Sequence, residues 1–202
     1  MKRLASIAGV LALALVLSVG LPASEAGAVD WLHGGSVGLW GGYQFSNEHG
    51  DFDTWKVGID YEHSLKFLDF CPKLEFAVQI PFEYWSAEPK AGIFEVDTTT
   101  WAIIPTLKAY YQLLPELRPY VGAGLGYART EYDEPIDAGE NSFAWRVVAG
   151  AEYQLLPRQP FAVFGEYEYT SVGLEDPRPV IGLGHDPDLG GNAISGGVRL
   201  RF

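Results

Sequence analysis

The stretch KLEFAVQIPFEYW, Lys73–Trp85, decides the fold because its side chains change character at every second residue. One alternate set is entirely apolar and consists of Leu74, Phe76, Val78, Ile80, Phe82 and Tyr84. The other set includes Lys73, Glu75, Gln79 and Glu83. A period of two predicts a β-strand with one apolar face rather than a helix. The run is also about twice as long as a typical strand of a soluble sheet.

The same alternation recurs along the chain, so the sequence predicts eight long amphipathic strands. The others cover Gly34–Ser46, Thr54–His63, Thr99–Leu113, Pro119–Arg129, Phe143–Leu155, Phe161–Thr170 and Ile194–Phe202. In the first of these, Trp40 falls on the polar side of the alternation. Two explanations stay open: a β-bulge at Gly41-Gly42 that shifts the phase, or a tryptophan that fills interior space.

Charged residues gather on the polar faces of these strands. They are Lys56, Lys73, Lys108, Arg146, Arg199 and Arg201, with Asp60, Glu62, Glu75, Glu83, Glu152, Glu166 and Glu168. Glycines lie on the same faces, whereas the bulky residues lie on the apolar faces. Because eight strands enclose little room, small residues and paired charges suit the interior, and the apolar faces must meet lipid. We therefore predict an all-β fold, an eight-stranded antiparallel up-and-down transmembrane β-barrel.

The aromatic residues of the apolar faces predict two belts at the membrane interfaces. One belt holds Tyr61, Tyr111, Tyr153, Phe161 and Phe202, and the other holds Phe45, Trp55, Tyr84, Trp101, Tyr127, Phe143, Tyr167 and Tyr169. The pentapeptide YQLLP ends two strands, at Tyr111–Pro115 and Tyr153–Pro157, and a short turn follows each copy. The connections at the opposite rim are longer, at about Asn47–Asp53, Ala87–Val96, Glu131–Asn141 and Ser171–Gly191. This asymmetry is typical of outer membrane barrels, and an even strand number places both termini on the periplasmic side.

The first residues predict export. Lys2 and Arg3 precede an uncharged apolar run, Leu4–Leu21, and the small residues Ala26-Gly27-Ala28 form a cleavage site. We expect a cleaved signal peptide over residues 1–28 and a barrel domain over residues 29–202, with an uncleaved anchor as the alternative. The formal net charge of −12 argues against non-specific binding of nucleic acid. The single cysteine, Cys71, permits no internal disulfide.

Two segments, RPYVGAGLGYAR (Arg118–Arg129) and SGGVRLRF (Ser195–Phe202), resemble the outer membrane β-barrel domain of the OmpA-like and opacity-like group. The resemblance implies an integral outer membrane protein in contact with lipid and lipopolysaccharide. The last strand, which ends in Phe202, resembles the signal that the barrel-assembly machinery reads. The peptidoglycan-binding domain of OmpA has no counterpart here, so no cell-wall tether is implied. We expect a monomer.

Three functions are compatible with such a barrel. We favour a structural or surface-interaction role, such as membrane integrity, adhesion or ligand contact through the long loops, with the lumen plugged by a charge network. The second is a narrow porin-like channel for small or hydrophobic solutes, and the third is an enzyme that modifies lipid A. Loop sequences vary freely on such scaffolds, so the fold alone does not select among them.

Few residues support chemistry. The histidines are His33, His49, His63 and His185, and His185 lies beside Asp186 and Asp188 with Ser195 ten residues further on. No hydrolase motif accompanies them, so we expect no enzyme and no catalytic or cofactor-binding residue. The loops are rich in Asp and Glu, which could share a divalent cation with lipopolysaccharide phosphates, but we favour solvated loops and expect no metal site.

Overall fold

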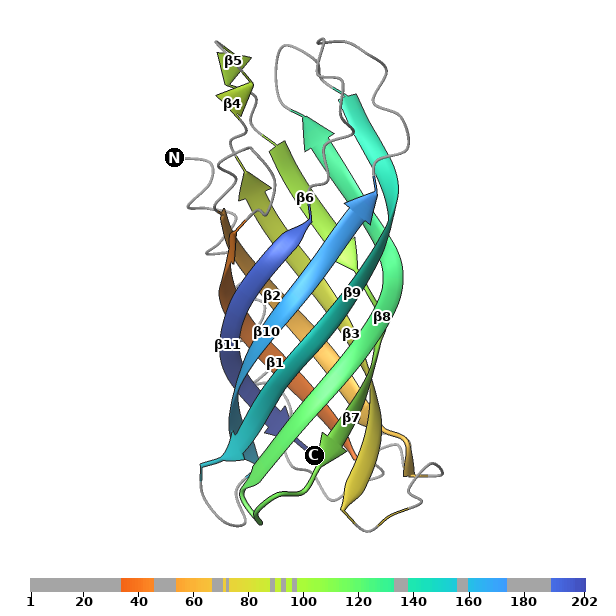
Figure 1. Cartoon of the computed structure of the whole chain (residues 1–202), viewed down its shortest axis with the longest axis vertical. Coiled ribbons are helices and arrows are strands. Elements are labelled where there is room, and N and C mark those ends of the chain that lie inside the picture. The colour runs from red at the N-terminus through yellow and green to blue at the C-terminus, as the bar shows by residue number, and fades with distance from the viewer. Residues whose placement is uncertain are drawn as a thin grey trace, which may run out of the picture. The chain divides into compact units, whose positions relative to one another are not determined.

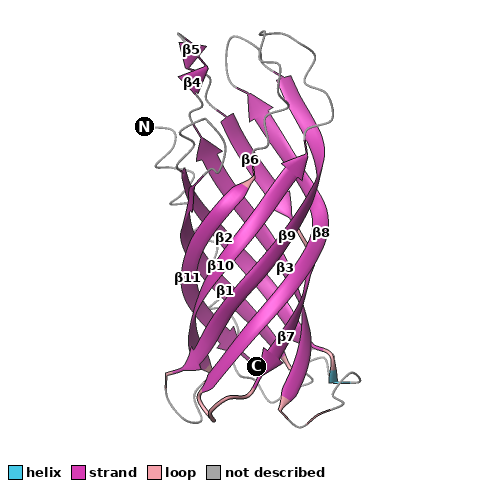
Figure 2. Ribbon diagram, viewed as in Figure 1, coloured by secondary structure: helices cyan, strands magenta, loops and turns pink. Residues whose placement is uncertain are grey.

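Long antiparallel strands wind around a common axis between Gly35 and Phe202 in the computed structural model of the protein (Figure 1). The structure describes residues 34–45, 54–66, 71, 73–87, 90–91, 94–95, 98–132, 138–155, 160–173 and 190–202. Most of these residues are strand, as Figure 2 shows. No helix among them is long and apolar enough to cross a membrane.

The strands follow one another round a closed ring in chain order. They are β1 (Gly35–Phe45), β2 (Thr54–Ser64), β3 (Leu74–Ala87), β6 (Thr98–Ile103), β7 (Thr106–Tyr111), β8 (Leu117–Tyr132), β9 (Ala138–Gln154), β10 (Phe161–Gly173) and β11 (Gly191–Arg201). β6 and β7 both pair with β3 and β8 and act as two halves of one strand. β1 pairs with β11 from Ser36↔Arg201 to Phe45↔Asn192 and closes the ring. The prediction of an eight-stranded antiparallel up-and-down barrel is confirmed.

The ring has two different rims. β1 joins β2, β3 joins β6, β8 joins β9 and β10 joins β11 at one end, here called the loop rim. β2 joins β3, β7 joins β8 and β9 joins β10 at the other end, the turn rim. A short hairpin of two strands of two residues each, β4 (Lys90–Ala91) and β5 (Phe94–Glu95), lies within the segment between β3 and β6.

Side chains alternate between the outer wall and the lumen as the period of two predicts. Ile103 and Val147, on the apolar faces, are 39% and 45% exposed. Lys56, Lys108 and Glu152, on the polar faces, are 0% exposed. The apolar faces therefore form the outer wall, and the charged faces line the interior.

Trp40 lies in the lumen, and β1 contains no bulge. The pairing of β1 with β11 continues without interruption through Trp40↔Gly197 and Gly41↔Gly196. The pairing of β1 with β2 is also uninterrupted at Trp40↔Gly58. Trp40 is 4% exposed, and a Cβ at Gly58 or Gly197 would collide with it. Of the two explanations, the filling of interior space is confirmed.

One predicted loop is largely strand. We expected a connection over Glu131–Asn141, but β8 and β9 stay paired through Thr130↔Glu140 to Tyr132↔Ala138. That prediction was wrong because the alternation of apolar and polar residues fades after Arg129, whereas the pairing of backbone groups does not depend on side-chain polarity. Most of the other predicted long loops lie outside the described residues.

Candidate functional site

The lumen is filled by charged side chains that form three clusters along the barrel axis. The upper cluster, nearest the loop rim, consists of Lys56, Glu83, Arg146 and Glu168. The middle cluster consists of Lys108, Tyr120, Glu166 and Ser195. The lower cluster, nearest the turn rim, consists of Asp60, Glu62, Glu75, Tyr110, Arg118, Glu152, Arg199 and Arg201.

The upper cluster pairs two cations with two carboxylates. Lys56 Nζ lies 2.5 Å from Glu168 Oε1 and 3.0 Å from Glu83 Oε2. Arg146 Nη1 donates to Glu83 and lies 3.4 Å from Glu168 Oε2. All four side chains are 0% exposed, so none of them is in contact with bulk water. The two positive and two negative charges cancel, so this layer carries no net charge. Burial of charged groups is tolerated when they are paired in this way.

Two of these ion pairs, Lys56–Glu168 and Arg146–Glu83, cross the lumen. Arg146 is on β9 and Glu83 is on β3, with two strands between them on the ring. Arg146 also donates from Nη2 to Gln79 Oε1 at 2.7 Å and from Nε to Thr106 Oγ1 at 2.7 Å. The guanidinium thus spans the interior and links strands that the backbone ladder does not join.

An apolar layer lies between the upper cluster and the loop rim. Its members are Trp85, Ala102, Ile104, Ala128, Ala144 and Val172, each at most 2% exposed. The Trp85 ring also covers Lys56, whose Nζ lies 4.9 Å from the ring centroid. A cation that faces an aromatic ring and two carboxylates is held in place on several sides.

The middle cluster is built around one carboxylate. Glu166 accepts hydrogen bonds from Lys108 Nζ at 3.2 Å and from Tyr120 Oη at 2.7 Å. Ser195 Oγ donates to the other Glu166 oxygen at 3.4 Å. The Lys108 ammonium also lies 4.3 Å from the centroid of the Tyr120 ring.

Arg199 organises the lower cluster. Its guanidinium lies 2.8 Å from Asp60 Oδ1, 3.0 Å from Glu62 Oε2 and 3.1 Å from Glu152 Oε2. The Tyr110 hydroxyl donates to Glu62 at 2.6 Å. One arginine therefore joins β11 to β2 and β9, and the tyrosine adds β7.

At the turn rim, the lower cluster becomes accessible to water. Arg118 Nη1 lies 2.5 Å from Glu75 Oε2, and Arg118 Nη2 lies 3.2 Å from Glu152 Oε1. Arg201 also contacts Glu152. The Glu75 side chain is 37% exposed and that of Arg201 is 30% exposed, so this layer is the mouth of the lumen rather than its seal.

The sequence placed most of this site correctly. All the charges predicted to face inward lie in the lumen or at its mouth except Lys73, which is exposed in the turn before β3. That assignment was wrong because the strand begins one residue later than predicted. Arg118 was missed, although it has the phase of Tyr120, because the predicted strand began at Pro119. The inward aromatic residues Tyr110 and Tyr120 were also missed.

The sequence was compared with protein-family models. It matches the model of the outer membrane protein beta-barrel domain over residues 11–202. The chain belongs to this family. Its barrel is therefore an outer membrane β-barrel, as the resemblance implied.

Solved structures of small outer membrane barrels share the fold of this family member. The Neisserial surface protein NspA is 19% identical, with a TM-score of 0.59 over 84% of this chain and 97% of that one. Ail, the attachment invasion locus protein of Yersinia pestis, is 13% identical, with a TM-score of 0.51 over 83% and 99% of the two chains. No curated protein matches the sequence.

Of the residues considered for other chemistry, His63 and Ser195 lie in the described part of the chain, and these two do not meet. His33, His49 and His185 lie outside the described residues, as do Asp186 and Asp188. His63 lies on the outer wall, 3.3 Å from the Tyr61 hydroxyl. Ser195 faces the lumen rather than the lipid side that an enzyme acting on lipid A would need.

Cation ligands and thiols give no further site in the described part of the chain. Among those residues, no group of three or more His, Cys, Asp or Glu side chains could hold a metal ion. The carboxylates of the predicted acidic loops lie mostly outside the described ranges. Cys71 is an exposed free thiol.

Proposed function

We propose that this protein is a sealed outer membrane barrel with a structural or surface-interaction role. The barrel anchors the protein in the membrane, and its loop rim is presented to ligands. The upper cluster is the observation that carries this proposal. Lys56, Glu83, Arg146 and Glu168 are 0% exposed, and the pairs Lys56–Glu168 and Arg146–Glu83 bridge strands across the interior. The apolar layer around Trp85 adds a second barrier on the loop side.

The energetics favour the sealed state over the alternative of a narrow channel. A water-filled path past the upper cluster requires at least one ion pair to separate. Each of the four charges has an opposite partner in this network, and separating one pair takes both side chains away from the partners that compensate them.

Planar-bilayer recordings test the seal. We expect no stable single-channel current from the native protein. A variant with Lys56→Ala, Glu83→Ala, Arg146→Ala, Glu168→Ala and Trp85→Ala should conduct, because the upper cluster then loses its charges and its bulk and the apolar layer loses its largest side chain. The matched control is Arg129→Ala with Glu131→Ala, an ion pair of 3.2 Å whose side chains are 43% and 55% exposed on the outer wall. This control should stay silent, and a large stable current from the native protein would contradict the proposal.

We further propose that the signal peptide over residues 1–28 is removed and that both termini and the turn rim face the periplasm. The short connections at the turn rim support this orientation. A protease added to intact cells should leave a tag at the C-terminus uncut.

The β1–β11 ladder leaves no open sheet edge, which supports a monomer. Phe202 is 40% exposed at the end of β11, where the barrel-assembly machinery would read it.

We expect no enzyme. Ser195 hydrogen-bonds to Glu166 inside the lumen, and His63 contacts Tyr61 on the outer wall, so the two residues do not meet. Mass spectrometry of lipid A should give the same profile with and without the protein. A new or missing acyl chain would contradict this expectation.

A further inference from the structure

The surface of the turn rim differs from one turn to another. Leu113 and Leu114, between β7 and β8, are 55% and 54% exposed, and Leu155, after β9, is 51% exposed. We call these three residues the leucine patch. The two turns are neighbours, since the Gln154 N–H donates to the Glu116 carbonyl at 2.8 Å. In the connection between β2 and β3, the described residues Lys66, Cys71 and Lys73 are instead exposed, whereas residues 67–70 and 72 lie outside the described part of the chain.

The leucine patch continues the lipid-facing wall. Tyr111 and Tyr153 are 45% and 47% exposed on the outer faces of β7 and β9, where they were predicted to form part of an aromatic belt. Leu113 and Leu155 each follow the tyrosine by two residues, just beyond the ends of β7 (Thr106–Tyr111) and β9 (Ala138–Gln154), and both are exposed. The apolar surface therefore extends past the belt on this side of the barrel.

The turn between β7 and β8 also satisfies its polar backbone from within the chain. The Gln112 side-chain amide donates to the carbonyl of Leu114 and, at 3.1 Å, to that of Pro115. The N–H groups of Leu113 and Leu114 donate to the Leu117 carbonyl at 3.2 Å. Water would satisfy such groups in an exposed turn, but in lipid they must find partners inside the protein.

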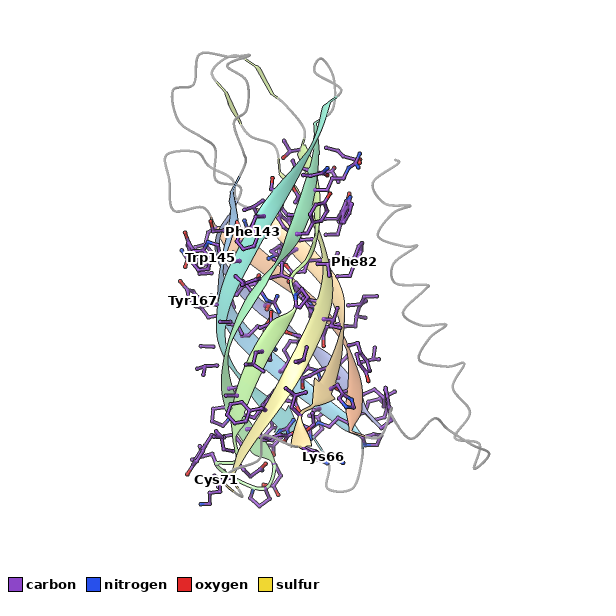
Figure 3. All side chains as sticks on the ribbon, turned by 90° about the vertical axis from the view of Figure 1, so that its right-hand side faces the viewer. Lys66, Cys71, Phe82, Phe143, Trp145 and Tyr167 are labelled. Carbon is purple, nitrogen blue, oxygen red and sulfur yellow. The ribbon has the colours of Figure 1, made fainter. Side chains whose placement is uncertain are left out.

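From these observations we propose that the leucine patch is immersed in acyl chains of the lipid leaflet at the turn rim. The barrel then sits deeper in the membrane at the leucine patch than at Lys66, Cys71 and Lys73 of the turn between β2 and β3. Lys66 and Cys71 mark that other turn at the end of the barrel opposite to Phe143, Trp145 and Tyr167 (Figure 3). The ammonium groups of Lys66 and Lys73 stay in water, as charged side chains at a membrane interface do. This inference rests on the membrane position of the barrel but not on its sealed lumen.

The single cysteine of the chain makes a direct test possible. An environment-sensitive fluorophore is attached to native Cys71, and in a Cys71→Ser background to Leu113→Cys, Leu155→Cys or Val147→Cys. The labelled proteins are reconstituted in phosphatidylcholine vesicles, and their folding is checked by far-UV circular dichroism. Quenching is measured with a lipid that carries a nitroxide on its acyl chain and with aqueous iodide. Val147 is the matched control for the lipid-facing wall, and Cys71 is the control for the wet turn.

We expect the probes at Leu113 and Leu155 to behave like the probe at Val147, with strong quenching by the lipid nitroxide and weak quenching by iodide. Iodide quenching as strong as at Cys71 would overturn the inference. Shielding from both quenchers would also overturn it, because a protein or a second copy would then cover the patch. If the probe at Val147 escapes the lipid nitroxide as well, the membrane position of the barrel is wrong, and the proposed function fails with it.

Discussion

In the lumen, a large side chain on one strand lies opposite a glycine on the next strand. Trp40 occupies the interior opposite Gly58, where a Cβ would fall inside the contact distance of the indole ring and 2.9 Å from the Phe82 carbonyl oxygen. Gly41, the next residue along β1, points outward, and a Cβ there would meet nothing nearer than the Lys56 carbonyl oxygen at 3.7 Å. Two glycines close together in the wall thus have different importance, which gives a matched pair of substitutions.

Gly58→Ala should destabilise the barrel by about 1–3 kcal/mol, because the new methyl group overpacks the lumen against Trp40. Gly41→Ala should change the free energy of unfolding by no more than about 0.5 kcal/mol. Urea titration in detergent micelles, followed by tryptophan fluorescence, measures both. Equal effects of the two substitutions would contradict the position of Trp40.

The buried ion pairs predict a second difference between residues. Arg146→Met leaves Glu83 and Glu168 with too few cations, and the loss should be about 3–5 kcal/mol. Adding Glu83→Gln to this variant should recover part of the loss, because one uncompensated carboxylate is removed. Arg129→Met breaks only an exposed pair and should cost about 0–1 kcal/mol. A similar loss for Arg146→Met and Arg129→Met, measured by the same titration, would exclude a buried network.

At the scale of the elements, β6 and β7 are interrupted at Ile104-Pro105 without any slip in register. The pairs with β3 are Phe82↔Ile103 on one side of the break and Gln79↔Thr106 on the other, which places Pro81 opposite Ile104. Neither proline has an N–H to donate to the ladder. The Ile104 carbonyl instead accepts a hydrogen bond from Thr106 Oγ1 at 2.8 Å.

Thr106→Val should therefore destabilise the break. It removes the donor to the Ile104 carbonyl and the acceptor of Arg146 Nε at 2.7 Å. Each buried polar group left without a partner costs about 1–3 kcal/mol. Thr99→Val, at an outward position of β6, is the control and should stay within about 0.5 kcal/mol. Hydrogen exchange should show faster amide exchange on both sides of the break in Thr106→Val alone.

At the scale of the whole molecule, the alternation of side chains predicted which face of each strand meets lipid. It did not predict the strand ends at Tyr132 and Ala138, because pairing outside the bilayer needs no apolar face. It also did not predict which carboxylate each cation contacts. Arg146 contacts Glu83 although two strands lie between them on the ring. The stagger and tilt of the strands bring these two side chains together, and no spacing of residues in the sequence predicts that contact.

The central claim is that the barrel is apolar outside and ionic inside, and neighbouring residues on β9 test it without any substitution. Val147 is 45% exposed on the outer wall, and Val148 is 4% exposed in the lumen. The measurement is the nuclear Overhauser effect between valine methyl protons and lipid acyl-chain protons, recorded on the native protein in lipid nanodiscs. We predict cross-peaks to the acyl chains from Val147 and none from Val148. Acyl-chain cross-peaks from Val148, with Val147 silent, would contradict the account.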